Sequence, residues 1–298
     1  MKGPSNFQGG RARALHMAIF ALAFQVVQGG AAVYTLSDVN SQVFIDPQTQ
    51  AGMHNWIVDN QPVAMQKQWF WYRVGPGGPE TSVDVLPFVG PILTDRNPFT
   101  DPSLDTFAIK YQGAQFDIEF TASLQGGVTN SGRADITEQI KISNTTGYPL
   151  EFHFFEYADF DLGQLFVANK AVPLPDDDLV LIKLDQVTGL PTEVVQWDAS
   201  MRVTETIITP DASLAEAAFF SFTLVKLNNA VADNLNNVLV AGPGDVTWAF
   251  QWDFMIDPYG SVQISKDKSV VPEPPAWSLV ALGLFGYGVL RRWVNRRK

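Results

Sequence analysis

Apolar and polar residues alternate with a period of two along most of the chain, as expected for β-strands that bury one face. Within residues 116–124 the apolar side chains fall on one face, whereas Asp117, Glu119 and Thr121 fall on the other. Large aromatic residues occupy every second position from Trp248 to Phe254. This spacing predicts strands that pack against an aromatic core.

Runs of this kind are separated by turns rich in Gly, Pro and Asn, and together they predict about 14 strands. One segment before the C-terminal region, Asp211–Ala218, has a helical pattern, and Asp211 after Pro210 can serve as its N-cap. The main predicted strands cover residues 68–74, 82–86, 107–111, 116–124, 136–143, 150–161, 179–184, 193–197, 201–208, 219–225, 238–240, 247–256 and 261–265.

The order of these segments decides the fold class. Because strands do not alternate with helices, the sequence predicts an all-β domain, a large two-sheet antiparallel β-sandwich with the supersandwich as a larger variant. The same alternation predicts a buried core that contains Phe116, Phe120, Ile140, Phe154, Trp248, Phe250 and Trp252.

Residues 1–32 have the parts of a secretory signal peptide. Arg11 and Arg13 precede the apolar stretch Met17–Val27, and small residues then lead to a predicted cleavage site after Ala31 or Ala32. The sequence therefore predicts export through the inner membrane. The exported β-sandwich domain is predicted to cover residues 33–268.

The C-terminal region joins three different segments. A Pro-rich tether is predicted at 269–275, and 15 residues without a charge follow as Ala276–Leu290. As a helix this run spans roughly 22 Å, and flanking Trp and Arg side chains extend its reach toward a bilayer core of about 30 Å. Residues 276–298 are thus predicted to form a transmembrane helix in contact with lipid. Its cytoplasmic basic end consists of Arg291, Arg292, Arg296, Arg297 and Lys298.

With Pro272, Glu273 and Pro274 as its motif, this tail resembles the PEP-CTERM sorting signal of Gram-negative bacteria. The resemblance implies an exosortase as partner, which cuts at or near the motif after a transient membrane-anchored stage. It also implies a cell-surface or extracellular destination in a species that exports polysaccharide. The segments 68–73, 154–161 and 246–253 resemble an uncharacterised all-β domain of such proteins, which implies no activity.

Charge and cysteine content narrow the partners of the exported domain. Residues 33–271 contain 12 Lys and Arg against 30 Asp and Glu, a net charge of −18, which argues against nucleic acid as a partner. The excess is compatible with divalent cations, with neutral polysaccharide, or simply with solubility. The chain has no Cys, which excludes disulfides, thiol chemistry and a lipoprotein anchor.

The segment 150–162 holds the most suggestive carboxylates. Strict alternation places Glu156 on the apolar face, and Asp159 and Asp161 together on the opposite face. Oxygen ligands of this kind suit Ca²⁺, so these residues predict a Ca²⁺ site or a sugar-binding carboxylate cluster. The alternative is a solvated strand face with Glu156 buried in an ion pair, with Arg73 or Arg133 as its partner.

Trp69 and Trp71 on a predicted strand could form a sugar-stacking platform, although aromatic residues on strands usually belong to the core. The sequence has no zinc cluster, phosphate loop or Gly-x-Ser-x-Gly motif, and no catalytic residue is predicted. The function predicted first is a non-enzymatic protein of the cell surface or polysaccharide matrix, without a cofactor other than Ca²⁺. The alternatives are a carbohydrate-binding module with structural Ca²⁺ and a secreted hydrolase on a β-sandwich scaffold.

Overall fold

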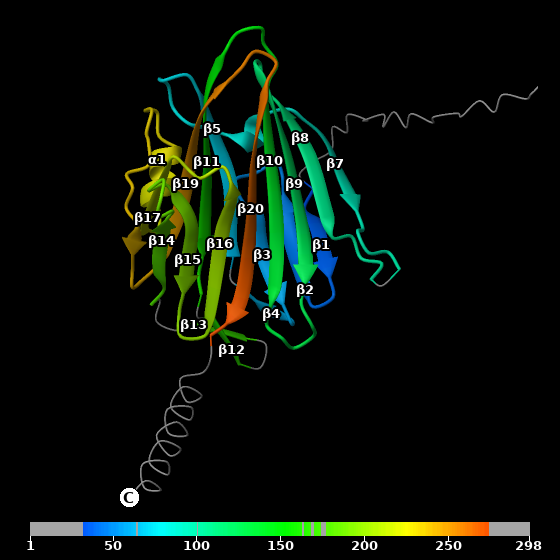
Figure 1. The fold of residues 1–298 in the computed structure, drawn as a ribbon. Helices are drawn as coiled ribbons and strands as arrows, with labels where there is room; N and C mark the ends of the chain where they lie inside the picture. The colour runs from blue at the N-terminus through cyan, green and yellow to red at the C-terminus, as the bar shows by residue number, and fades with distance from the viewer. Residues whose placement is uncertain are drawn as a thin grey trace, which may run out of the picture.

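Two large β-sheets lie face to face in the computed structural model (Figure 1). The structure describes residues 32–273, except 64, 100, 163, 168–169 and 174–176. Both sheets are antiparallel, apart from one short parallel contact between β3 (Gly52–Val58) and β5 (Met65–Val74). The predicted all-β class with two antiparallel sheets is therefore confirmed.

The first sheet, called sheet A, is built from strands of the N-terminal part and three later strands. Two short strands lie off its main path, since β4 (Gln61–Pro62) pairs with β3 and β6 (Thr81–Ser82) pairs with β5. The order along the path is β1 (Tyr34–Asp38), β2 (Ser41–Asp46), β3, β5, β11 (Leu150–Phe160), β19 (Val246–Ile256) and β17 (Leu214–Phe219).

The second sheet, called sheet B, contains most of the remaining strands. Its order is β18 (Val240–Ala241), β14 (Leu179–Leu184), β15 (Pro191–Trp197), β16 (Met201–Thr209), β20 (Ser261–Pro272), β10 (Ala134–Asn144), β9 (Phe116–Gly126), β8 (Thr106–Gln112) and β7 (Phe88–Thr94). A separate hairpin pairs β12 (Gln164–Val167) with β13 (Lys170–Pro173). The described helices are the 3₁₀ turn η1 (Val83–Val85) and the short α1 (Phe222–Leu227).

Aromatic side chains fill the space between the sheets. The rings of Phe70 in sheet A and Phe120 in sheet B have centroids 5.1 Å apart in an edge-to-face contact. Phe152 and Phe116 make a similar contact at 4.8 Å. These distances and angles are favourable for aromatic pairs. All seven predicted core residues are at most 3% exposed, so the alternation identified the inner face correctly.

The prediction of a helix at Asp211–Ala218 is wrong, and so is that of a strand at 219–225. Residues Leu214–Phe219 form β17, which pairs with β19 along its whole length. The small side chains of Ala215 and Ala217 are buried against the sheet, and this packing outweighs their helical propensity. The helix begins only after Ser221, whose positive φ of 70° ends the strand. Strands β1 to β4, β7, β12 and β13 were not predicted, and most of the strand predicted at 82–86 is the 3₁₀ turn η1.

The β-sandwich domain ends later than predicted, because β20 continues to Pro272 between β16 and β10 (Figure 1). Pro272 lies beyond the end of the β10 ladder and pairs only with Met201 of β16, so its missing N–H costs no β10 hydrogen bond. The Glu273 N–H donates to the Ser200 carbonyl at 2.9 Å, and its carboxylate lies 3.1 Å from Arg202 Nε. The boundary therefore moves from 268 to 272.

Several predicted segments lie outside the described residues. They are the signal peptide up to Ala31, Pro274, the transmembrane helix over 276–290 and the basic residues Arg291 to Lys298. Within the part of the chain that the structure describes, no helix combines the length and the apolar character that crossing a membrane requires.

Candidate functional site

The carboxylates on and just after strand β11 lie in two different parts of the structure. Glu156 points between the sheets, where its carboxylate meets Lys266 of sheet B. Asp159, near the end of the strand, and Asp161, just beyond it, belong to a separate group with Asp245, which directly precedes β19. One carboxylate oxygen from each of these three aspartates lies within 4.8 Å of the others.

The three aspartates line a cavity of about 300 Å³, called here the acidic hollow. Its other lining residues are Gln66, Lys67 and Phe220. The phenyl ring of Phe220 is 46% exposed, so the hollow presents an apolar face beside its charged groups. Burial raises the pKa of Asp245 above its usual value. The hollow thus combines carboxylates, an amide, an ammonium group and an aromatic ring.

The sheet register brings these residues together. Lys67 of β5 and Thr247 of β19 are the two register neighbours of Asp159, so the ends of three adjacent strands meet at one edge of the sheet. The Phe220 N–H donates to the Asp245 carbonyl at 2.8 Å and holds the backbone of Phe220 beside that of Asp245. The sequence analysis identified Asp159 and Asp161 but missed Asp245. The turn Gly242–Gly244 before β19 was the available signal for a residue at this strand end.

Glu156 does not join that site, and its predicted role as a metal ligand beside Asp159 and Asp161 is wrong. It belongs to a group, called here the core charge cluster, whose members are at most 1% exposed. The predicted arginine partner is also wrong, because Arg73 pairs with Glu80 instead. The members of the cluster are Gln68, Glu138, Glu156, Glu205, Lys266 and Lys268.

Opposite pKa shifts occur within the core charge cluster. Burial acts to raise the pKa of Glu138, but Lys266 and Lys268 outweigh it and lower the pKa to about 2. Burial, reinforced by the negative charge of Glu205, raises the pKa of Glu156 to about 8. Burial acts to lower the pKa of Lys266, but the surrounding glutamates raise it overall.

Trp69 and Trp71 cannot provide the predicted sugar-stacking platform. Their side chains are 1% and 0% exposed, whereas stacking requires a ring face open to solvent. Trp69 Nε1 donates to Ser82 Oγ at 3.1 Å, and Trp71 Nε1 donates to Asn228 Oδ1 at 3.3 Å. Exposed aromatic residues lie elsewhere, and they include Phe219, Phe220 and Phe222, at and beyond the end of β17.

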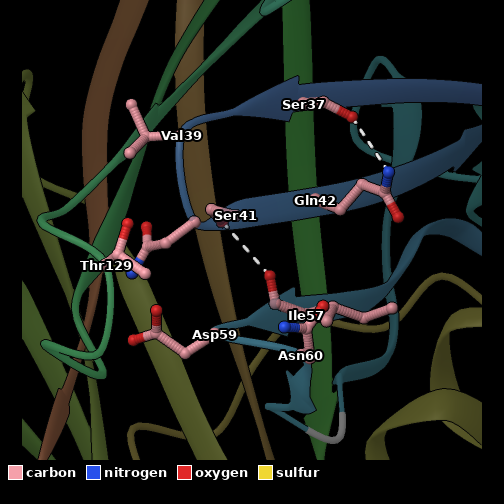
Figure 2. Close-up of a pocket in the computed structure, with 9 residues that line it drawn as sticks. Ser37, Val39, Ser41, Gln42, Ile57, Asp59, Asn60 and Thr129 are labelled. Atoms are coloured by element: carbon pink, nitrogen blue, oxygen red, sulfur yellow. Dashed lines mark hydrogen bonds between the residues drawn. The ribbon is translucent and has the colours of Figure 1, made fainter.

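A second cavity, of about 220 Å³, lies between the turns of sheet A and the loop after β9 (Figure 2). Several of its polar side chains bond within the protein. Asp59 accepts from the backbone N–H groups of Asn130 and Gly132 at 2.6 and 2.7 Å. Gln42 Nε2 donates to Ser37 Oγ at 3.1 Å (Figure 2). This cavity therefore belongs to a clasp that ties sheet A to a loop of sheet B.

Two further groups of ionisable residues have structural partners. His153 Nδ1 lies 2.5 Å from Asp253 Oδ1 and links β11 to β19. Asp178 accepts from Leu162 N–H and from Gln196 Nε2, both at 2.8 Å, so it anchors the segment after β11. These contacts hold strands and loops in place.

No family model matches the chain, and no curated protein matches it. Solved structures do match its fold. A galactose mutarotase related enzyme from Lactobacillus acidophilus aligns with a TM-score of 0.46 and 9% identity, over 82% of this chain and 98% of that one. A putative aldose 1-epimerase from Escherichia coli K12 gives 0.45 and 11%, over 82% and 99%. One from Klebsiella pneumoniae gives 0.42 and 10%, over 86% and 84%.

With identities of 9–11% and TM-scores below 0.5, the likeness assigns no activity, substrate or residue role to this chain. None of these structures supports the function predicted first from the sequence. That prediction was a non-enzymatic protein of the cell surface or matrix, whereas the matched structures are described as mutarotase-related and epimerase proteins. The prediction of a non-enzymatic matrix protein is therefore withdrawn.

Proposed function

We propose that the domain is an exported carbohydrate-binding module whose binding site is the acidic hollow. The observation that carries this proposal is the convergence of three carboxylates, the Gln66 amide and the exposed Phe220 ring in one cavity of about 300 Å³. Sugar hydroxyls donate to carboxylates and accept from amides, while the C–H face of a sugar ring packs on a phenyl ring. Cavities with a few convergent polar groups are the usual form of small-ligand sites.

A Ca²⁺ ion suits the same residues. Ca²⁺ takes about six to eight oxygen ligands at about 2.3–2.6 Å, and carboxylates from neighbouring loops are common among them. The oxygens of Asp159, Asp161 and Asp245 lie within 4.8 Å of one another, so a single ion can contact all three. Sugar hydroxyls would complete its coordination shell. In this proposal the ion offsets the mutual repulsion of the aspartates and orients the sugar.

The spacing of the carboxylates argues against an inverting hydrolase. Inverting glycosidases separate their two carboxyl groups by about 6.5–9.5 Å, which leaves room for a water molecule. In the acidic hollow, one carboxylate oxygen of each aspartate lies within 4.8 Å of the others. A shared ligand explains such close approach better than an acid and base placed on opposite sides of a glycosidic bond.

A calorimetric titration with neutral oligosaccharides in the presence of Ca²⁺ tests this proposal. Asp245→Asn should weaken binding at least about tenfold, because it removes one charged ligand from the hollow. Asp257→Asn is the matched control, since Asp257 is exposed just beyond the other end of β19. Absence of binding to any glycan tested, or equal affinities of wild type and Asp245→Asn, would refute a carbohydrate site in the hollow.

We also propose that this module is sorted through its ends. A signal peptide over residues 1–32 and a transmembrane helix over 276–290 would flank a sandwich of the supersandwich type, and an exosortase would cut at or near Pro272, Glu273 and Pro274. The order of tether, apolar run and basic tail supports this proposal. Mass spectrometry of the extracellular protein is the test. A released form that still yields a peptide containing Arg291 or Arg292 would contradict cleavage at the motif.

A further inference from the structure

The core charge cluster joins the two sheets through side chains of five strands. Gln68 of β5 and Glu156 of β11 come from sheet A. Glu138 of β10, Glu205 of β16, and Lys266 and Lys268 of β20 come from sheet B. All six residues are at most 1% exposed, so water screens none of these charges.

A count of charges shows that the cluster needs an additional proton. Three carboxylates and two ammonium groups would leave one unbalanced negative charge between the sheets if every group were ionised. An uncompensated charge in a dry core costs several kcal/mol, and a buried group commonly neutralises instead. One bound proton makes the cluster neutral.

The hydrogen bonds indicate where that proton resides. Lys266 Nζ lies 2.8 Å from Glu138 Oε2, and Gln68 Nε2 donates to both oxygens of Glu138, which stabilises the ionised form. Lys268 Nζ lies 2.6 Å from Glu205 Oε2. Glu156 differs, because only its Oε1 atom is contacted by Gln68 and Lys266. Its Oε2 atom has no hydrogen-bond partner among the described residues.

The surroundings of Glu156 favour its neutral form as well. Its carboxyl group lies within 4.8 Å of those of Glu138 and Glu205, and Glu205 Oε1 also lacks a hydrogen bond within the described chain. The two lysines also lie next to aromatic rings, which have no charge: Lys266 lies over Phe70 at 5.6 Å, and Lys268 lies over Trp248 at 5.5 Å. Among the described residues, the cluster therefore has no additional cation to balance an ionised Glu156.

We propose that Glu156 binds this proton in the folded protein, and that its loss as the pH rises weakens the contact between the two sheets. The folded state then takes up a proton that the unfolded chain releases near the ordinary glutamate pKa of 4.5. Stability from this group is complete below that value and falls as the pH rises toward about 8, where the folded state also ionises. The domain would be more stable to unfolding in mildly acidic surroundings than in alkaline ones.

Glu156→Gln tests the proposal, because an amide keeps the shape of the side chain and stays neutral at every pH. Urea unfolding is measured for wild type and variant between pH values near 5 and near 8. The folding equilibrium constant of the wild type should fall by up to about tenfold per pH unit relative to the variant, the effect of one proton. Glu119→Gln, a change at a partly exposed glutamate of β9, keeps Glu156 and should show the same pH dependence as wild type.

A constant difference between wild type and Glu156→Gln across this window would overturn the proposal. Infrared spectroscopy of the wild type gives a second measurement that needs no variant. The C=O stretch of a protonated carboxylic acid should be present at neutral pH and should disappear as the pH rises through about 8. A spectrum without this band at neutral pH would likewise contradict a proton on Glu156.

Discussion

The core charge cluster and the acidic hollow each bring three carboxylates within 4.8 Å, yet they differ in what offsets the charge. Between the sheets, Lys266 and Lys268 lie against the glutamates, and our proposed proton completes the balance. In the hollow, three aspartates share a cavity with one lysine, Lys67. Burial forces neutrality in the first region. In the second only Asp159 is buried, and the partial exposure of Asp161 and Asp245 lets the group keep an excess of negative charge that a ligand can use.

The largest expected effect comes from removing a lysine in the buried region. Lys266→Met should destabilise the protein by about 3–5 kcal/mol, because it leaves buried carboxylates without their partner. The matched change Lys67→Met in the hollow should cost less than about 0.5 kcal/mol, as is usual for surface positions. Urea unfolding of both variants measures the difference. Equal losses of stability in the two variants would show that burial does not decide how much each lysine contributes.

The core charge cluster should also make the stability of the protein depend on pH in acid. The pKa of Glu138 is lowered from 4.5 to about 2, so its contribution is present above 4.5 and is lost as the pH falls through about 2. Wild type should therefore lose stability across this range, and Glu138→Gln should show a shallower acid dependence. Urea unfolding between pH values near 5 and near 2 provides the measurement. An acid dependence identical in both proteins would exclude Glu138 as its source.

A smaller effect of opposite sign is expected in the hollow. Without Ca²⁺, Asp245→Asn should stabilise the protein by about 0.2–1 kcal/mol, because it removes one of three neighbouring like charges. Asp257→Asn, at the other end of β19, should leave the stability unchanged. Thermal melts in EDTA compare the three proteins. A clear destabilisation by Asp245→Asn would mean that this carboxylate has a structural role in the metal-free protein.

Alternation along the sequence was sufficient to predict most strands of the two sheets and the residues of the inner face. It placed Phe154 and Glu156 on one face of β11 and Asp159 on the other, but the second face is buried too and is not the solvated face that the alternative interpretation expected. It failed for Leu214–Phe219, because the pairing with β19 that makes this segment a strand lies outside any local window. The same limit applies to the missed strands β1 to β4.

The partners of the carboxylates were harder to predict than their faces. Glu156 and Lys266 are 110 positions apart, and only the register of two sheets brings them together. A signal was present, since Ile264, Lys266, Lys268 and Val270 alternate and so share a face with apolar residues. The prediction ended the domain at Lys268 and thereby overlooked these lysines as core residues. Asp245 was missed because it precedes its strand and has no neighbour in sequence with the same role.

The central claim, that the excess negative charge of the acidic hollow serves a ligand, is tested most directly by calorimetry of Ca²⁺ binding. Wild type and Asp257→Asn should bind one Ca²⁺ with the same affinity, and their melting temperatures should rise with the ion and return with EDTA. Asp245→Asn should bind at least about tenfold more weakly and show little shift. If wild type shows no heat of binding and no shift, or if Asp245→Asn behaves like wild type, the claim is contradicted.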